Sequence, residues 1–491
     1  MDPLLAQSVT QPGVDWHALA PELVMASAAC IVLVADLFLP RNSRWIAMPL
    51  SAAGIIGTLA AVVSLIGTET TTLAGTFEVD VFSLLFKALF CVLGLIILAI
   101  SFHYFRGGSY YQGEYYFLLL CSLFGGLVIA SARDLISLFI ALELISIPGI
   151  VMVALRKGDA RSNEGALKFF LFSVLSSAVM LYGMSLIYGM TGSTLLAEIS
   201  SSIEASDQPI IVLSVFFVVV GFAFKISAVP FHFWAPDTYE GAPSPVAAFL
   251  STASKIGGFV GLLVLMFKAF PTVADTWAPV FGVLAALTMT VGNLIALRQQ
   301  QVIRLLAYSG IAQSGYILVC LALISPNPGD QAANEQAFAA AVIYLAIYGI
   351  MDLGAFAAAI AFARRGGTYF ISDYAGLWQR SPVLALLFGG FLISLAGAPP
   401  MAGLIAKLFV FAATIEAEVY WLAIVMGVNT VIAAWYYLAV IKKMFFETPE
   451  IDEPVEVPYL MTAAMGLATV VLVGLLIYPA LLIDLADRSI F

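Results

Sequence analysis

Several lysines and one glutamate of this sequence lie deep inside long apolar stretches, where no water solvates a charge. Lys225, Lys255 and Lys407 are the deepest amines, and Glu143 is the deepest carboxylate. A charge at the middle of a bilayer costs about 2.5–3.5 kcal/mol on insertion scales, so each needs a partner or a wet cavity. Lysine suits a proton carrier because its surroundings readily change its affinity for a proton, whereas arginine stays charged. These residue types predict ion transfer, most simply of protons.

Glu143 follows Asp134 by nine residues, which on a helix places it roughly 13 Å below the membrane boundary, at 1.5 Å per residue. We expect Lys225 to be its partner, since a lysine within about 4–6 Å keeps a buried carboxylate ionised. Movement of that lysine charge would release or capture a proton. The alternative is a static ion pair that locks two helices, although such pairs are often no more stabilising than apolar contacts.

His232 follows Lys225 by seven residues, and histidine takes up and releases protons near neutral pH. It is predicted to relay protons between Lys225 and Lys255; the alternative is an ordinary hydrogen-bonded core histidine. Hydroxyl side chains precede Lys255 at Ser251 and Ser254, where they could hydrogen-bond water.

Three further ionisable residues are weaker candidates. Asp352 lies in the small-residue stretch IYGIMDLGAFAAA and is expected to pair with Lys407 or with Arg304, which starts a helix and can snorkel to the interface. Lys87 lies nearer the outer end of its stretch, seven residues after Asp80. It is expected to snorkel or to form a local pair.

Proline interrupts two of the apolar stretches close to a lysine. Pro230 follows Lys225 by five residues, and Pro399 and Pro400 precede Lys407. Proline removes a helical hydrogen bond, and in lipid the freed carbonyls must be satisfied by neighbours, side chains or water. Either proline alone would be an ordinary kink. A lysine beside each break favours a functional role.

Transmembrane helices are the elements that must position these residues. Hydrophobic residues form 62% of the chain and charged ones 11%, a balance that excludes a soluble fold. The predicted fold is all-α and polytopic, with about fourteen helices. Their predicted ranges are 20–39, 47–67, 79–102, 114–132, 135–155, 165–190, 209–229, 245–270, 277–297, 304–324, 338–363, 383–411, 420–443 and 459–484.

We interpret residues 1–491 as one membrane domain. Helices 1–3 occupy 1–113, a first five-helix repeat 114–270, a second 271–443, and helix 14 lies in 444–491. The broken helices 7 and 12 are each fourth in their set of five, which is typical of transporters built from inverted repeats.

Lysine and arginine are distributed unevenly between the loops, which predicts that both termini lie on the outer face of a plasma (inner) membrane. Loops after even-numbered helices hold only Arg133 and Lys268. Loops after odd-numbered helices, taken as cytoplasmic, hold Arg41, Arg44, Arg106, Arg156, Lys157, Arg161, Arg298, Arg364, Arg365, Arg380, Lys442 and Lys443. The four cysteines stand singly without a nearby histidine cluster, so no metal or iron–sulfur site is expected.

The sequence resembles the antiporter-like membrane subunits of respiratory complex I, and most closely those of type N. The resemblance covers almost the whole chain. It is carried by APELVM, DVFSLLFK, DLISLFIALELISIP, SNEGALKFFLFSVLSSAVMLYGMSLIYGMTG, FKISAVPFHFWAPDTYEGAPSPVAAFLSTASK, RLLAYSGIAQSGY and AGAPPMAGLIAKLFVF.

This resemblance implies roles for individual residues. The glutamate of helix 5 matches Glu143, and the lysines of helices 7, 8 and 12 match Lys225, Lys255 and Lys407, with the histidine after helix 7 matching His232. Lysine rather than glutamate on helix 12 argues against the M-type subunit, and the absence of a long lateral helix argues against the L-type. One departure is a glutamine in IAQSGY, where paralogous subunits usually carry a histidine.

The resemblance also implies a proton-translocating subunit of an NADH-quinone oxidoreductase with no redox centre of its own. NADH, FMN, iron–sulfur clusters and quinone would bind to other subunits. The expected partners are the lipid bilayer and the M-type, K-type and J-type membrane subunits, and no nucleic acid. The main alternative is a subunit of a multi-subunit cation/proton antiporter. A single-chain carrier of an organic solute and a purely structural scaffold fit the buried lysines less well.

Overall fold

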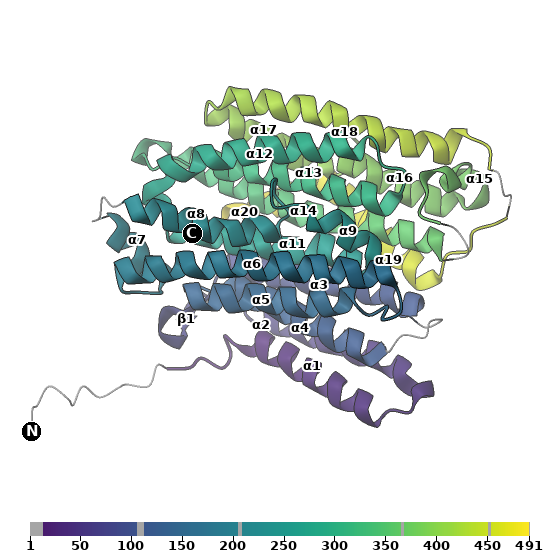
Figure 1. Ribbon diagram of the computed structural model, residues 1–491, viewed down its shortest axis with the longest axis horizontal. Coiled ribbons are helices and arrows are strands. Elements are labelled where there is room, and N and C mark those ends of the chain that lie inside the picture. Colours follow the sequence, from purple (N-terminus) through teal and green to yellow (C-terminus); the bar gives the residue numbers. More distant parts are fainter. Residues whose placement is uncertain (1–12, 106–111, 205–208, 365–367, 450–452, 491) are drawn as a thin grey trace, which may run out of the picture.

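Because lipid offers no hydrogen-bond partners, an apolar chain is expected to satisfy its backbone groups within helices. The computed structural model agrees with this expectation and describes residues 13–105, 112–204, 209–364, 368–449 and 453–490. Within these ranges the long helices lie side by side, from the purple α1 at one edge of Figure 1 to the yellow-green α18 at the other. Arg106, Arg365 and both chain ends, on which the predicted orientation partly rests, lie outside the described residues.

The N-terminal part contains three long helices and a small hairpin before the third. Its elements are α1 (Ala20–Phe38), η2 (Arg41–Ile46), α2 (Ala47–Ser64), β1 (Thr70–Thr72), η3 (Leu73–Gly75), β2 (Phe77–Val79) and α3 (Val81–Phe105). The two strands are antiparallel, with Thr70 opposite Val79. The sequence predicts no strand here because three residues are too few to show alternation.

The middle part carries the first broken helix. Its elements are α4 (Gln112–Ser131), α5 (Leu135–Val153), α6 (Ala160–Thr191), α7 (Leu196–Glu204), α8 (Pro209–Lys225), α9 (Trp234–Gly241), α10 (Ser244–Phe249), the π-turn η4 (Leu250–Ser254) and α11 (Lys255–Lys268).

The last part carries the second broken helix. Its elements are η5 (Pro271–Val273), α12 (Ala274–Ala296), α13 (Val302–Ala322), η6 (Pro328–Asp330), α14 (Gln331–Ala363), η7 (Ile371–Tyr374), α15 (Leu377–Arg380), α16 (Pro382–Ala396), α17 (Gly403–Glu416), α18 (Tyr420–Phe446), α19 (Tyr459–Ile477) and α20 (Ala480–Asp487).

Twelve helices in the described ranges are long and apolar enough to cross a membrane, and α8 and α16 are shorter apolar helices. In Ser244–Lys268 and in α14, an apolar stretch of 18 residues is completely buried by neighbouring helices, whereas only about a fifth to a third of such a stretch is buried in α1, α18 and α19. Charges within these two buried stretches therefore face protein. Lys255 and Asp352 belong to these two central spans.

The helices break where the prolines predict. The predicted broken helix 209–229 ends earlier than expected: α8 ends at Lys225, and the chain runs irregularly until α9 begins at Trp234. In the second break α16 ends at Ala396, and Gly397 takes a left-handed backbone conformation (φ +82°) that favours glycine. The division into two five-helix repeats stays a prediction.

Candidate functional site

All four lysines predicted to lie inside spans are buried, with exposed fractions of 0% for Lys87 and Lys255, 1% for Lys225 and 7% for Lys407. Snorkelling therefore does not relieve their charge. Each amine must be compensated by the atoms around it, because an unpaired buried charge costs several kcal/mol.

Lys225 ends α8 at the first break, and its Nζ donates a hydrogen bond to Ser146 Oγ on α5 at 2.8 Å. Its stem packs on Gly258 of α11, where an added Cβ would lie 2.9 Å from Lys225 Cγ. At the break the Phe224 carbonyl accepts two hydrogen bonds, from the Ser227 backbone N–H at 3.0 Å and from the Trp234 indole N–H at 3.1 Å. The amine is thus held at an opened helix end, beside a hydroxyl and not a carboxylate.

Glu143 lies on α5, one turn before Ser146, and is only partly buried. It accepts a hydrogen bond from Ser177 on α6. No direct ion pair between Glu143 and Lys225 forms among the described residues, although the glutamate charge still acts on the lysine. The predicted partners are therefore close, but in this conformation each has a serine as its own hydrogen-bonding neighbour.

His232 lies between α8 and α9 with 5% of its surface exposed. Its Nδ1 makes no hydrogen bond within the described part of the chain, and its ring centre lies 4.4 Å from that of Phe233. A buried ring nitrogen without a partner can accept or donate a proton. Its predicted relay from Lys225 to Lys255 stays a prediction.

Lys255 is the first residue of α11 and follows the π-turn directly. Its Nζ donates no hydrogen bond to another described residue and lies 5.9 Å from the centre of the Tyr239 ring. π-turns inside α-helices occur frequently at functional sites. The helix is therefore locally distorted at the residue that carries the charge.

Asp352 does not pair with Lys407 or Arg304, so this prediction is wrong. Its Oδ2 accepts hydrogen bonds from Ser251 Oγ at 2.6 Å and from Tyr348 OH at 3.4 Å. Lys255 is the cation whose charge acts on it. The prediction failed because the partner comes from the central span about a hundred residues earlier, and sequence spacing cannot reveal such a contact.

Arg304 instead joins a charged pocket beside α9. Its guanidinium contacts Asp237 at 3.1 Å and Glu240 at 2.6 Å, and Lys168 also contacts Asp237, at 2.7 Å. Partial burial of Asp237 opposes its ionisation, but the hydrogen bonds from Lys168 and Arg304 outweigh it and hold the pKa of Asp237 below its ordinary value. Arg304 thus fixes α13 against α9.

Lys407 lies on α17 in the second break. Its Nζ donates to the carbonyl of Ala396, the last residue of α16, at 2.8 Å and lies 4.7 Å from the centre of the Tyr316 ring. The C-terminal end of a helix attracts a cation, since its free carbonyls carry partial negative charge. Both breaks therefore place the C-terminal end of a helix near a lysine.

Gln313, the departure from the resembling family, connects the centre to the second break. Its Nε2 donates to Leu395 O at 3.0 Å, and its Oε1 accepts from Tyr344 OH. Tyr344 stacks on Tyr316, the ring beneath Lys407, with 6.4 Å between the ring centres. Polar groups therefore continue from the centre of the bundle towards Lys407.

Lys87 neither snorkels nor pairs with Asp80, so that expectation is corrected. It forms an ion pair with Glu22 of α1 at 2.7 Å, and its Nζ lies 4.8 Å from the centre of the Phe77 ring. Glu22 was not among the predicted site residues, although a glutamate in the first turn of an apolar helix is a signal that the sequence contains.

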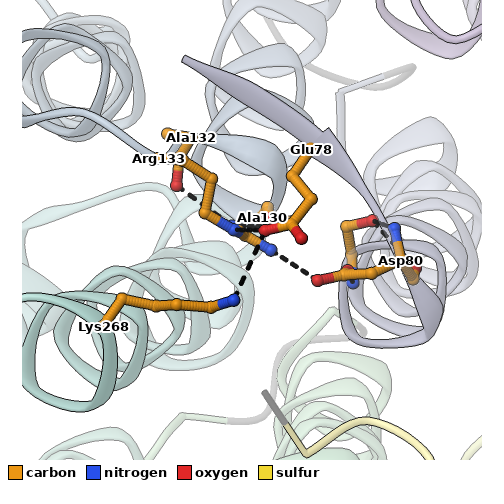
Figure 2. Close-up of polar contacts among 7 residues, drawn as sticks. Glu78, Asp80, Ala130, Ala132, Arg133 and Lys268 are labelled. Carbon is orange, nitrogen blue, oxygen red and sulfur yellow. Dashed lines mark hydrogen bonds and ion pairs between the residues drawn. The ribbon is translucent and has the colours of Figure 1, made fainter. Parts of the chain in front are cut away.

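Asp80 belongs to a second charged cluster, shown in Figure 2, at the hairpin end of the bundle. Arg133 donates to Asp80 at 2.7 Å and also to Glu78, and Lys268 lies 3.6 Å from Glu78. The cluster ties the end of α11 to the hairpin and to the start of α5.

Among the described residues no group of three or more His, Cys, Asp or Glu side chains could hold a metal ion. The site is instead a set of polar side chains, buried except for the partly buried Glu143: Glu143, Lys225, His232, Lys255, Asp352, Gln313 and Lys407. The amines, carboxylates and imidazole among these groups can exchange protons with one another.

Comparison with known proteins matches residues 132–433 to a family described as NADH:quinone oxidoreductase/Mrp antiporter, TM. The chain is 43% identical to NADH-quinone oxidoreductase subunit N 2 of Streptomyces griseus over 88% of this chain and 83% of that protein. It is 38% identical to NADH-quinone oxidoreductase subunit N of Moorella thermoacetica over 96% and 98%, respectively. Its structure is similar to a chain of respiratory complex I from Thermus thermophilus with bound aureothin, with a TM-score of 0.79, 29% identity, and 95% and 99% of the two chains covered.

Proposed function

Because the chain belongs to the NADH:quinone oxidoreductase/Mrp antiporter family, we propose that it is the proton-translocating N-type membrane subunit of an NADH-quinone oxidoreductase. The chain is a multi-pass membrane protein, and other membrane subunits of the complex are its partners. NADH, FMN, iron–sulfur clusters and quinone bind elsewhere in the complex. Our proposal adds that the contacting subunits are of the M-, K- and J-types.

One observation carries the proposal: three buried lysines stand at helix distortions. Lys225 and Lys407 lie in the two breaks, and Lys255 follows the π-turn. Prolines and π-turns expose backbone groups that fit only where side chains or water can satisfy them. A chain that needed charges merely to hold its helices together would have no reason to place each at such a point.

In the proposed mechanism, Lys225 changes partner between Ser146 and Glu143. Close to Glu143 its ammonium form is favoured, and close to Ser146 it loses that support, so the change of partner captures or releases a proton. The proton then passes through His232 to Lys255, and Lys407 exchanges protons with the outer face. Water-filled half-channels would supply Lys225 and Lys255 from the cytoplasm.

The orientation is part of the proposal. With both termini on the outer side of the plasma membrane, the loops rich in lysine and arginine face the cytoplasm, as the positive-inside rule requires. Labelling of a single cysteine placed at Lys442, at the end of α18, tests it. A thiol reagent that cannot cross the membrane should label this cysteine in intact cells only after the membrane is opened.

Replacing Lys225 or Glu143 by alanine should abolish or greatly reduce proton pumping by the assembled complex in membrane vesicles. The measurement is the number of protons moved per NADH oxidised, with Lys442→Ala and Glu416→Ala as controls that remove the same charges from exposed positions. Quinone reduction with an unchanged proton ratio in Lys225→Ala and Glu143→Ala would refute the proposal.

The family name also covers Mrp antiporters, so a subunit of a multi-subunit cation/proton antiporter is the second candidate. Affinity purification of the tagged chain from its native membrane separates the two. Quinone-reductase subunits should copurify under our proposal, and their absence together with antiporter subunits would favour the second candidate.

A further inference from the structure

Two buried charges from distant parts of the chain meet around the Ser251 hydroxyl. Asp352 lies on α14 and Lys255 on α11, and the side chains of both are 0% exposed. Ser251, in the π-turn just before Lys255, donates its hydroxyl proton to Asp352 Oδ2 at 2.6 Å. The π-turn thus links the Asp352 carboxylate of α14, through the Ser251 hydroxyl, to the helix that begins with Lys255.

Gly310 of α13 shows that the amine borders the same space. A Cβ atom added at Gly310 would lie 2.9 Å from Lys255 Nζ, 3.1 Å from Tyr348 OH and 3.3 Å from Ser251 Oγ. Three polar atoms therefore surround the position where any other residue would carry a methyl or methylene group. The missing side chain leaves room for the amine to approach the hydroxyl.

Some polar atoms around this space lack hydrogen-bond partners, which leaves them able to donate or accept a proton. Within the described residues, neither Lys255 Nζ nor Asp352 Oδ1 has a hydrogen-bond partner. Tyr348 OH donates to the Ser251 carbonyl at 2.7 Å, which fixes the π-turn in place. A lysine stem is flexible and its amine can rotate. The acceptor is thus held rigidly while the donor stays free to move.

We propose that Asp352 is a proton-carrying residue that receives the proton of Lys255 through the Ser251 hydroxyl; this inference rests on the proposed function. In the step, an N–H bond of the Lys255 ammonium breaks and its proton binds Ser251 Oγ. The original hydroxyl proton of Ser251 moves to Asp352 Oδ2 and forms an O–H bond there. Serine is regenerated, no electron moves, and two buried opposite charges become a neutral amine and a neutral acid.

This step would move the proton from the first predicted repeat to the second. Lys255 lies in the range 114–270, and Asp352 lies in the range 271–443 that also holds Gln313 and Lys407. A proton on Asp352 has therefore left the Lys225 side of the chain and reached the side where polar groups lead to Lys407. Asp352 is also the described carboxylate whose charge acts on Lys255.

The competing interpretation is that Asp352 is a static hydrogen-bond acceptor that pins α14 to the π-turn. Asp352→Asn separates the two, because asparagine keeps an acceptor oxygen for Ser251 but cannot take up a proton, whereas Asp352→Glu restores an acid. Gly310→Ala removes no ionisable group and only fills the space between amine and hydroxyl. Gly427→Ala is its control, since an added Cβ there meets nothing within 4 Å.

The assay is the proton-to-NADH ratio of the whole complex in proteoliposomes, beside the NADH oxidation rate. We expect Asp352→Asn and Gly310→Ala to lower the ratio as far as Lys255→Ala does, Asp352→Glu to restore most of it, and Gly427→Ala to change nothing. If Asp352→Asn does not assemble, Ser251→Ala replaces it, with Thr252→Ala as control because Thr252 donates only to the Ala248 carbonyl of its own helix.

The inference is overturned if Asp352→Asn, or Ser251→Ala in its place, pumps at the wild-type ratio while Lys255→Ala does not. It is likewise overturned if Asp352→Glu recovers none of the loss, because restoring an acid at this position would then not restore the proton transfer. Full pumping by Lys255→Ala itself is a different outcome: it refutes the proposed function and not this step alone.

Discussion

The ion pair between Lys87 and Glu22 allows a quantitative prediction, because both side chains are almost fully buried. Their exposed fractions are 0% and 7%, and 2.7 Å separates the amine from the carboxylate. Removing one partner of a buried pair leaves the other charge uncompensated, which costs about 3–5 kcal/mol. Lys87→Met and Glu22→Gln should therefore each lower the folded-to-unfolded ratio of this chain by roughly 10²–10⁴.

The double variant should behave differently. Glu22→Gln combined with Lys87→Met removes both charges and keeps most of the side-chain volume under the Phe77 ring, so it should lie close to wild type in stability. The loss of unfolding free energy in the double variant would then be smaller than the sum of the two single losses by about 3 kcal/mol or more, which indicates direct coupling between the two side chains. Proton pumping should survive in the double variant, because Lys87 pairs with Glu22 and, within the described ranges, forms no hydrogen bond or ion pair with Lys225.

The assay is brief proteolysis of the purified complex after equilibration in increasing urea, with the intact chain detected through a terminal tag. The shift of the urea midpoint is proportional to the change in unfolding free energy. Lys442→Met serves as control at an exposed position. The reasoning is refuted if Lys87→Met shifts the midpoint no more than this control, or if the double variant is as unstable as the two single losses added together.

Two further predictions concern neighbouring contacts. Ser146→Ala removes the hydroxyl that accepts from Lys225, so pumping measured in vesicles should slow several-fold, and unchanged pumping would show that this hydrogen bond is incidental. Arg133→Met leaves Glu78 and Asp80 without their main partner; because both are partly exposed, we expect a loss of only about 1–3 kcal/mol in the urea assay, and a loss as large as that of Lys87→Met would contradict this.

The deepest residues could be located from the sequence because an intramembrane charge is expensive and therefore conspicuous. Lys225, Lys255 and Lys407 are buried as predicted, and the prolines beside Lys225 and Lys407 mark true breaks in the helices. Long apolar runs gave most helices within a few residues. These features depend on local composition, which a single sequence contains.

Contacts between distant segments could not be predicted in the same way. The partner of Asp352 is a serine about a hundred residues earlier, and Lys87 meets a glutamate of α1. Many carboxylates and hydroxyls have suitable chemistry, and only the packing of the helices selects one. The π-turn before Lys255 was also invisible, because LSTAS contains no proline or glycine to mark it.

The central claim is that the buried amines exchange protons with water from both faces. An experimental map of the complete complex, resolved finely enough to show ordered water, tests it most directly. We predict chains of waters that connect the row from Lys225 through Lys255 to Lys407 with the cytoplasmic face at one end and the outer face at the other. Dry pockets that enclose all three amines, with no water leading to either face, would contradict the account.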